Sequence, residues 1–316
     1  MAGRMASLGQ QPEATEVVRR ALEGRRADWR SRLFEGFLLF SLVVAFFFLV
    51  WLLVATFVES IPVWTERGLL DFLNTPLASN PDNAGISQGL FGSVVMMFLV
   101  ALLALPAGVA AAIYLEEYAP DNVLSRTLNT IIRNLAGVPA VVYGILGLSF
   151  FVLTMEGVTG GRTVISGGLT LAVLVLPITI IVSAESLRSV PASIREAGFG
   201  VGATRWEVIR SHVLPYSAPG ILTGVILTLA RAFGETAPLL LVGAAATGFA
   251  QPANATLLDQ LHGPYTSLPT IIYVWARNPN PGFQPLTSAA ILVLVVVILL
   301  VNAIAIILRN RYARKW

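Results

Sequence analysis

The chain has 316 residues, of which 55% are apolar and only 12% are charged, with a mean hydropathy of +0.74. A soluble globular domain carries roughly 25% charged residues, so this composition excludes that class and indicates a membrane protein. Cysteine is absent, which excludes disulfides, thiolate metal sites and cysteine nucleophiles. The only lysine is Lys315, so the sequence lacks the phosphate-binding loop ending in Gly-Lys-Ser/Thr and the chain does not hydrolyse ATP by itself.

The first 35 residues precede any long apolar run and are rich in arginine. We predict that they form a basic cytoplasmic N-terminal tail, and that residues 36–316 form a six-helix transmembrane domain. In the tail, the apolar residues Val18, Leu22, Trp29 and Leu33 lie near helical spacing. This pattern is typical either of a helix lying on an anionic membrane surface or of a solvated basic segment.

The transmembrane prediction is based on apolar stretches long enough to cross the roughly 30 Å hydrocarbon core of a bilayer. We therefore predict an all-α, polytopic bundle. Its six expected helices lie near residues 36–58, 89–115, 135–155, 168–187, 217–246 and 286–308.

Prolines fall inside four of these six stretches. A proline within a helix removes a backbone hydrogen bond and tends to kink the helix. Membrane helices tolerate proline in general, but four together favour a bundle that moves. The residues are Pro106, Pro139, Pro177 and Pro238.

The distribution of arginines predicts the orientation of the bundle. They concentrate in the N-terminal tail, in the loop before the third stretch, in the loop at 188–216 and at the C-terminus. The opposite side would hold only Arg67, Arg162 and Arg277. Because arginine and lysine near helix ends favour the cytoplasm, we predict that both termini and the 188–216 loop are cytoplasmic.

The 188–216 loop has a helical pattern of its own. We expect a first helix capped by Ser193, with Glu196 at the capping-box spacing, and a glycine break that includes Gly202. A second helix then places Trp206, Ile209 and Val213 on one face and ends at Leu214-Pro215. Two short helices joined by glycine suit docking in a groove of another protein, although a plain connecting hairpin is the alternative.

The fifth stretch carries two charges near mid-membrane, Arg231 and Glu235. A charge at that depth costs on the order of 2.5 to 3.5 kcal/mol, so Arg231 should face protein or water. With Gly220, Gly224 and Thr228 these residues form one helical stripe, small at one end and polar at the other. Either the pair fixes helix packing, or Arg231 contacts a crossing anion, because a guanidinium matches phosphate oxygens with two parallel hydrogen bonds.

The 188–216 loop resembles that of the integral permeases of ATP-binding cassette (ABC) importers. Their pattern is Glu-Ala-Ala, three residues, Gly and then Leu-Pro, although Gly198 here replaces the second alanine. The resemblance implies that the loop fits a cleft of a separate ATPase subunit. The residues implied to couple to the ATPase are Glu196, Ala197, Gly198, Gly202, Leu214 and Pro215.

The segments at 134–148 and 231–244 are similar to those of the A-type permease subunits of the phosphate-specific ABC importers, the PstA family. This resemblance implies a path for inorganic phosphate that involves Thr228, Arg231 and Glu235. It also implies partners: a second homologous permease subunit, an ATPase dimer that carries ATP and Mg²⁺, and an extracytoplasmic phosphate-binding protein. No cofactor on this chain and no nucleic acid is implied, and the expected location is the bacterial cytoplasmic (inner) membrane.

Other classes of membrane protein fit these sequence features less well. An intramembrane hydrolase lacks support, because the only histidines, His212 and His262, lie outside the predicted membrane helices. An ion-coupled secondary transporter would also bury isolated charges, but it gives no reason for the loop motif. A purely structural membrane subunit would not need Arg231. Permeases for sulfate, molybdate or small polar solutes share the loop, so phosphate depends on the fifth stretch alone.

Overall fold

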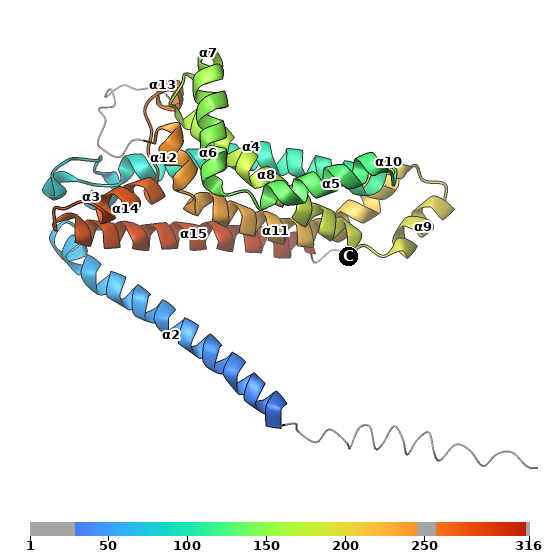
Figure 1. Ribbon diagram of the computed structural model, residues 1–316, viewed down its shortest axis with the longest axis horizontal. Coiled ribbons are helices and arrows are strands. Elements are labelled where there is room, and N and C mark those ends of the chain that lie inside the picture. Colours follow the sequence, from blue (N-terminus) through green and yellow to red (C-terminus); the bar gives the residue numbers. More distant parts are fainter. Residues whose placement is uncertain (1–28, 245–256, 314–316) are drawn as a thin grey trace, which may run out of the picture. The chain divides into compact units, whose positions relative to one another are not determined.

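The computed structural model describes residues 29–244 and 257–313 (Figure 1). Within these ranges the chain is helical and has no strand, which confirms the predicted all-α class. The chain divides into two compact units, residues 1–55 and 56–316. The predicted N-terminal tail lies, up to residue 28, outside the described residues, and its residues 29–35 belong instead to the first described helix, which begins at Trp29.

The structure describes the following helices. The first, α2 (Trp29–Glu66), runs from the first unit into the second. The others lie in the second unit: α3 (Leu69–Asn74), the 3-10 turn η1 (Pro81–Asn83), α4 (Ser87–Ile113), the π-helical turn η2 (Tyr114–Tyr118), α5 (Val123–Ala136), α6 (Ala140–Gly147), the π-helical η3 (Leu148–Thr154), α7 (Glu156–Thr159), α8 (Val164–Arg188), α9 (Ala192–Gly200), α10 (Arg205–Val208), the π-helical η4 (Ile209–Val213), α11 (Leu214–Gly234), α12 (Ala237–Val242), α13 (Leu257–His262), α14 (Leu268–Ala276) and α15 (Phe283–Ala313).

Among the described residues, five helical runs are long and apolar enough to cross a membrane. They are α2, α4 with η2, α8, the run from α10 to α11, and α15. A sixth span results if α5 and the α6–η3 helix are counted as one bent pair. The predicted six-helix bundle is therefore confirmed, with differences in the third and fifth members.

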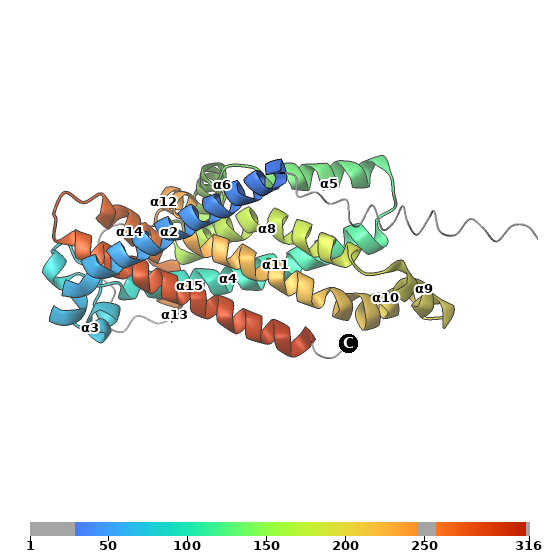
Figure 2. The same ribbon diagram turned by 90° about the horizontal axis from the view of Figure 1, so that it is seen from below.

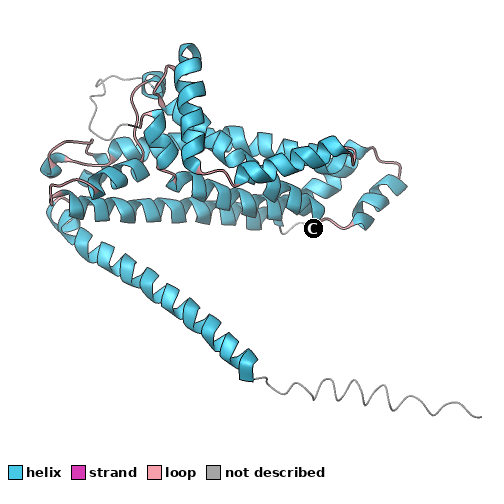
Figure 3. Cartoon of the chain, viewed as in Figure 1, coloured by secondary structure: helices cyan, strands magenta, loops and turns pink. Residues whose placement is uncertain are grey.

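The third member is not one straight helix, because α5 and α6 meet at an angle of 99°. Figure 3 shows the bend as a short loop between two helices. Pro139 holds an extended conformation (φ −56°, ψ 137°) before α6, and a proline disfavours the helical conformation of the residue before it. The Tyr143 hydroxyl donates to the carbonyl oxygen of Leu135 at 2.9 Å, so the corner regains a hydrogen bond.

The fifth member also differs from its prediction as one continuous helix over 217–246. The helix α11 ends at Gly234, Glu235 is extended (φ −75°, ψ 121°), and α12 begins at Ala237. Pro238 explains the break, since it has no N–H to donate to the carbonyl of Gly234 and its ring would clash there. In the first turn of α12 the same proline is well tolerated. Residues 245–246 of the prediction lie outside the described residues.

Four helices of the second unit, α4, α8, α11 and α15, run alongside one another (Figures 1 and 2). In the most apolar 18-residue segment of α8, 67% of the residues are buried, a larger share than in the other three helices. The central helix is therefore α8. Gly108 of α4 and Gly224 of α11 allow this packing. A Cβ at either position would overlap the side chains of Thr179 or Val182 on α8. Small residues thus bring these backbones close together.

The apolar core of the second unit continues to both ends of the bundle. One buried cluster, which includes Phe72, Leu268 and Trp275, lies at the end with α3 and α14. Another includes Leu187, Val190 and Val208, at the end with α9 and α10. The 188–216 loop is therefore packed into the bundle and is more than a flexible connection.

Candidate functional site

The first helix of the 188–216 loop is α9, and it begins directly after Pro191. Pro191 is extended (φ −56°, ψ 140°) and precedes the first helical residue, with no side chain capping the helix. The prediction of Ser193 as the cap is wrong, because Ser193 lies inside the first turn. The predicted glycine break is found: Gly202 has a φ of +82°, in the left-handed region that favours glycine.

The second helix of the loop has the capping box that the prediction placed on the first. The Thr204 hydroxyl accepts from the Glu207 amide at 3.4 Å, and the Glu207 carboxylate accepts from the Thr204 amide at 2.8 Å. Both orphan amides at the start of α10 are thereby satisfied. The signal was available in the sequence, since Thr204 and Glu207 stand at the Thr-x-x-Glu spacing.

This second helix does not end at Leu214-Pro215, which corrects the prediction. The run from α10 through η4 to α11 is continuous from Arg205 to Gly234. Pro215 removes one hydrogen bond of a regular helix, and the wider π-helical turn of η4 directly before α11 takes up the change. A displacement of α10 would therefore reach α11 through one continuous helix.

The residues implied to couple to an ATPase differ in exposure. Glu196, Ala197 and Gly202 are exposed, whereas Gly198 is buried and Leu214 and Pro215 are half-buried. Gly198 packs on Val208, because a Cβ at Gly198 would lie 2.7 Å from a Val208 methyl carbon. The departure from the Glu-Ala-Ala pattern thus has a physical reason, the close approach of α9 to α10.

The loop also presents apolar side chains to the outside. Phe199 is 48% exposed, Val201 83% and Trp206 52%. The sequence predicts one apolar face of Trp206, Ile209 and Val213. Ile209 and Val213 are buried as this predicts, but Trp206 is exposed and the prediction is wrong for it. Exposed Phe199, Val201 and Trp206 lie on both sides of the glycine break at Gly202, and large exposed apolar side chains are typical of a contact surface.

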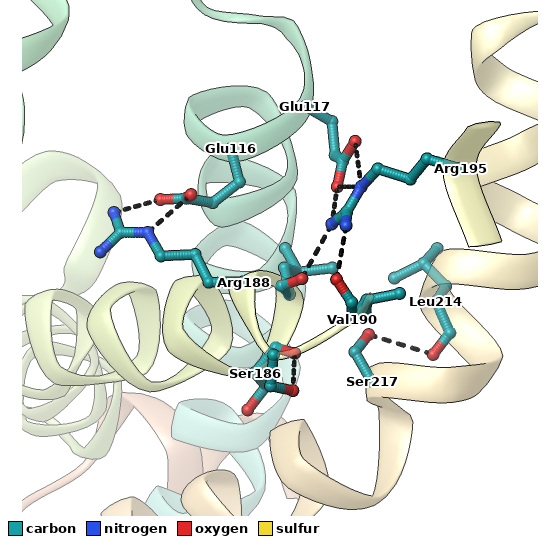
Figure 4. A network of polar contacts seen from close by, with 10 residues as sticks. Glu116, Glu117, Ser186, Arg188, Val190, Arg195, Leu214 and Ser217 are labelled. Atoms are coloured by element: carbon teal, nitrogen blue, oxygen red, sulfur yellow. Dashed lines mark hydrogen bonds and ion pairs between the residues drawn. The ribbon is translucent and has the colours of Figure 1, made fainter. Parts of the chain in front are cut away.

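Two acidic residues of η2 hold the base of the loop, and the sequence reasoning missed both (Figure 4). Glu116 accepts from Arg188 Nε at 2.7 Å, and Glu117 accepts from Arg195 Nη2 at 2.7 Å. The carboxylates are only 14% and 10% exposed. Their signal in the sequence is weak: two adjacent glutamates close an apolar stretch on the arginine-rich side.

The second candidate site is the pair Arg231 and Glu235 at the break between α11 and α12. The distance from Arg231 Nε to Glu235 Oε1 is 3.4 Å. The Arg231 side chain is 55% exposed and that of Glu235 is 19% exposed. The predicted pair is formed, but Glu235 follows the last helical turn of α11 and approaches Arg231 from an extended segment.

Thr228 is not brought to this pair. It is 2% exposed, and its hydroxyl donates to the carbonyl oxygen of Gly224 at 2.8 Å. The small end of the predicted stripe has a packing role, because Gly220 and Gly224 lie against Ser186 and Val182 of α8. Of the predicted translocation residues, Arg231 and Glu235 are therefore together and Thr228 belongs to the helix interface.

The fold, with its helical loop at one end of the bundle, is that of the permeases of ABC importers. A bacterial ABC transporter involved in the import of the acidic polysaccharide alginate has a chain with a TM-score of 0.61 and 15% identity, covering 92% of this chain and 99% of that one. At that identity the likeness concerns the fold alone. Residues 104–316 match the family of binding-protein-dependent transport system inner membrane components, and the chain belongs to that family.

Curated relatives extend the similarity over nearly the whole chain. The phosphate transport system permease protein PstA 1 of Mycobacterium tuberculosis (strain CDC 1551 / Oshkosh) is 33% identical over 300 residues, which are 95% of this chain and 94% of the relative. The phosphate transport system permease protein PstA of Yersinia pestis is 29% identical over 98% of this chain and 99% of its own length. The chain is thus similar to these phosphate transport permeases over nearly its whole length.

Proposed function

We propose that this chain carries inorganic phosphate inward across the bacterial cytoplasmic membrane, together with a second related permease subunit. A separate ATPase dimer, with its own ATP and Mg²⁺, docks on the 188–216 loop, and an extracytoplasmic phosphate-binding protein delivers the ion. Both termini are cytoplasmic. The similarity to phosphate permeases over nearly the full chain supports this proposal.

The observation that carries the phosphate assignment is the half-exposed guanidinium of Arg231. In an apolar helix such a group does not face lipid, because an unscreened charge there is costly. Its exposed side therefore faces the second permease subunit or the water-filled path between the two subunits. Within the described residues its polar contact runs through Nε to Glu235, which leaves Nη1 and Nη2 for two parallel bonds to an oxyanion.

Glu235 gives the site a means of release. A guanidinium bound too firmly to phosphate would stall transport, whereas a carboxylate 3.4 Å away competes for the same group. Because Glu235 is held by the extended segment at the helix break, a small movement of α12 relative to α11 changes this competition. The broken helix thus links a change in the bundle to the affinity for the anion.

The ATPase contact is supported by the exposed side chains of the loop. Phe199, Val201 and Trp206 offer an apolar patch, and Glu196 lies exposed on the same short helix as Phe199. A short amphipathic helix in a groove is a common mode of recognition between proteins.

The test is uptake of labelled phosphate by proteoliposomes that contain the complete complex and the binding protein, with sulfate as the competitor. We expect uptake that depends on ATP and is displaced by phosphate and not by sulfate. Arg231→Ala should lower it by at least roughly tenfold, since charge-assisted hydrogen bonds are lost. Arg126→Ala, at an exposed arginine outside the site, is the matched control. Competition by sulfate as strong as by phosphate, or normal uptake by Arg231→Ala, would contradict the proposal.

A further inference from the structure

The turn η2 uses three successive residues to hold three arginines of the loop region. Glu116 binds Arg188 at the end of α8, and Glu117 binds Arg195 on α9. The next residue, Tyr118, lies under the guanidinium of Arg205 on α10, 5.6 Å from the ring centre. We call Glu116, Glu117 and Tyr118 the η2 platform. One turn of five residues thus contacts the helix before the loop and both helices within it.

Arg195 is the central member of this arrangement, as Figure 4 shows. Besides Glu117, it donates to the carbonyl oxygens of Leu187 at 2.9 Å and Val190 at 2.7 Å. These carbonyls belong to the last turn of α8 and the link that follows it. A planar guanidinium therefore joins α9 to the end of α8 and to η2 in a fixed geometry.

The position of η2 connects these contacts to the helix α4. The turn continues α4, and α4 packs along the central helix α8. The loop is connected covalently to α8 and α11 only, whereas the platform adds α4 as a third connection. Arg195 directly precedes Glu196, the first residue of the Glu196-Ala197-Gly198 motif. A displacement of this motif therefore acts on the platform directly, through the Arg195–Glu117 ion pair.

We propose that the η2 platform is a positioning element that transmits movement of the loop to α4, so that α4 and α8 move together with α11 during transport. This inference rests on the proposed docking of an ATPase at the loop. Without the platform, α9 would pivot on the link at 189–191 and ATP hydrolysis would continue with little movement of the bundle. The platform would then determine coupling efficiency and leave ATPase binding itself intact.

The experiment measures ATP hydrolysed per phosphate transported in the reconstituted complete complex. Glu117→Gln keeps the size of the side chain and removes the charge that holds Arg195. We expect uptake to fall roughly tenfold while ATP hydrolysis stays within about twofold, in the range of ordinary coupling energies. The matched control is Asp121→Asn, since the Asp121–Arg126 ion pair lies nearby but is exposed on both sides, at 85% and 70%.

A second pair of variants separates positioning from mere stability. If Glu117 and Arg195 act through each other, the double variant Glu117→Gln/Arg195→Gln should be no worse in coupling ratio than the worse single variant. If Glu117→Gln yields no complex, Tyr118→Leu decides, because it removes only the ring under Arg205 and should lower uptake by roughly twofold to fivefold.

The outcomes distinguish this inference from the proposed function. An unmodified complex that retains no ATPase would defeat the proposed function. If the unmodified complex couples normally and both Glu117→Gln and Tyr118→Leu have an unchanged ratio of ATP to phosphate, only the inference is overturned. A raised ratio in these variants, with Asp121→Asn unchanged, supports it.

Discussion

At the scale of single residues, two kinds of contact position the candidate sites. Some leave no space for a larger side chain, and others bring opposite charges together. Gly198 is an example of the first, because it allows α9 to pack on Val208 of α10. Arg231 and Glu235 are an example of the second, since the end of α11 brings their side chains within 3.4 Å. Each case gives a prediction.

Gly198→Ala introduces the methyl group that the Glu-Ala-Ala pattern has at this position. We expect it to destabilise the packing of α9 by about 1 kcal/mol, because the new Cβ would lie 2.7 Å from a Val208 carbon. Thermal unfolding of the purified complex measures the change. The control is Gly200→Ala in the same helix, where nothing lies within 4 Å of the added carbon. In a Val208→Ala background Gly198→Ala should cost little further stability, and an undiminished cost there would place the strain elsewhere.

Glu235→Gln removes the carboxylate that, in the proposed mechanism, competes with phosphate for Arg231. We expect tighter binding in the path and slower release, so that maximal uptake falls several-fold while the half-saturating concentration falls with it. The measurement is concentration-dependent uptake into proteoliposomes with matched amounts of assembled complex. An unchanged maximal rate would remove Glu235 from the release step.

At the scale of elements, hydropathy in the sequence is sufficient to locate the spans but not their breaks. The apolar stretches at 89–115 and 168–187 correspond closely to α4 and α8. The break at Glu235–Thr236 was missed because Pro238 acts on the carbonyl four residues before it, whereas its own position remains helical. Pro106 and Pro177 lie inside the unbroken helices α4 and α8, so a proline in an apolar stretch does not by itself locate a break.

The η2 platform could not be predicted for a different reason. Glu116 and Arg188 are 72 residues apart, and Glu117 and Arg195 are 78 apart. No local spacing relates such residues, since their contact depends on how α4 and α8 pack. The arginines in the 188–216 loop were interpreted only as a signal of orientation, and their role in holding the loop required the fold.

Pro238→Ala tests the origin of the break between α11 and α12. The substitution restores an N–H that can donate to the carbonyl of Gly234, so we expect the two helices to join. Because the chain lacks cysteine, spin labels can be placed at Leu227→Cys and Leu241→Cys. A continuous helix would set their backbone separation at about 21 Å, and the unsubstituted protein carrying the same labels gives the separation across the break. Uptake should fall, and an unchanged distance would assign the break to other residues.

At the scale of the whole molecule, two separate observations favour the same end of the bundle as the docking face for the proposed ATPase. The excess of arginine predicts that the end with the 188–216 loop is cytoplasmic. The same end has exposed Phe199, Val201 and Trp206, together with the acidic residues that fix the loop. The positive charge that orients the chain is thus partly the charge that holds the loop, through Arg188 and Arg195.

This orientation is testable with two single-cysteine variants at opposite ends of the second unit. Val201, in the loop, is 83% exposed, and Leu70, in α3, is 73% exposed. In intact spheroplasts a membrane-impermeant maleimide should label Leu70→Cys and spare Val201→Cys, because arginine-rich loops remain on the cytoplasmic side. Opening the membrane with detergent should then label both, which controls for accessibility. Labelling of Val201→Cys in intact spheroplasts would place the loop outside and separate it from any ATP-driven partner.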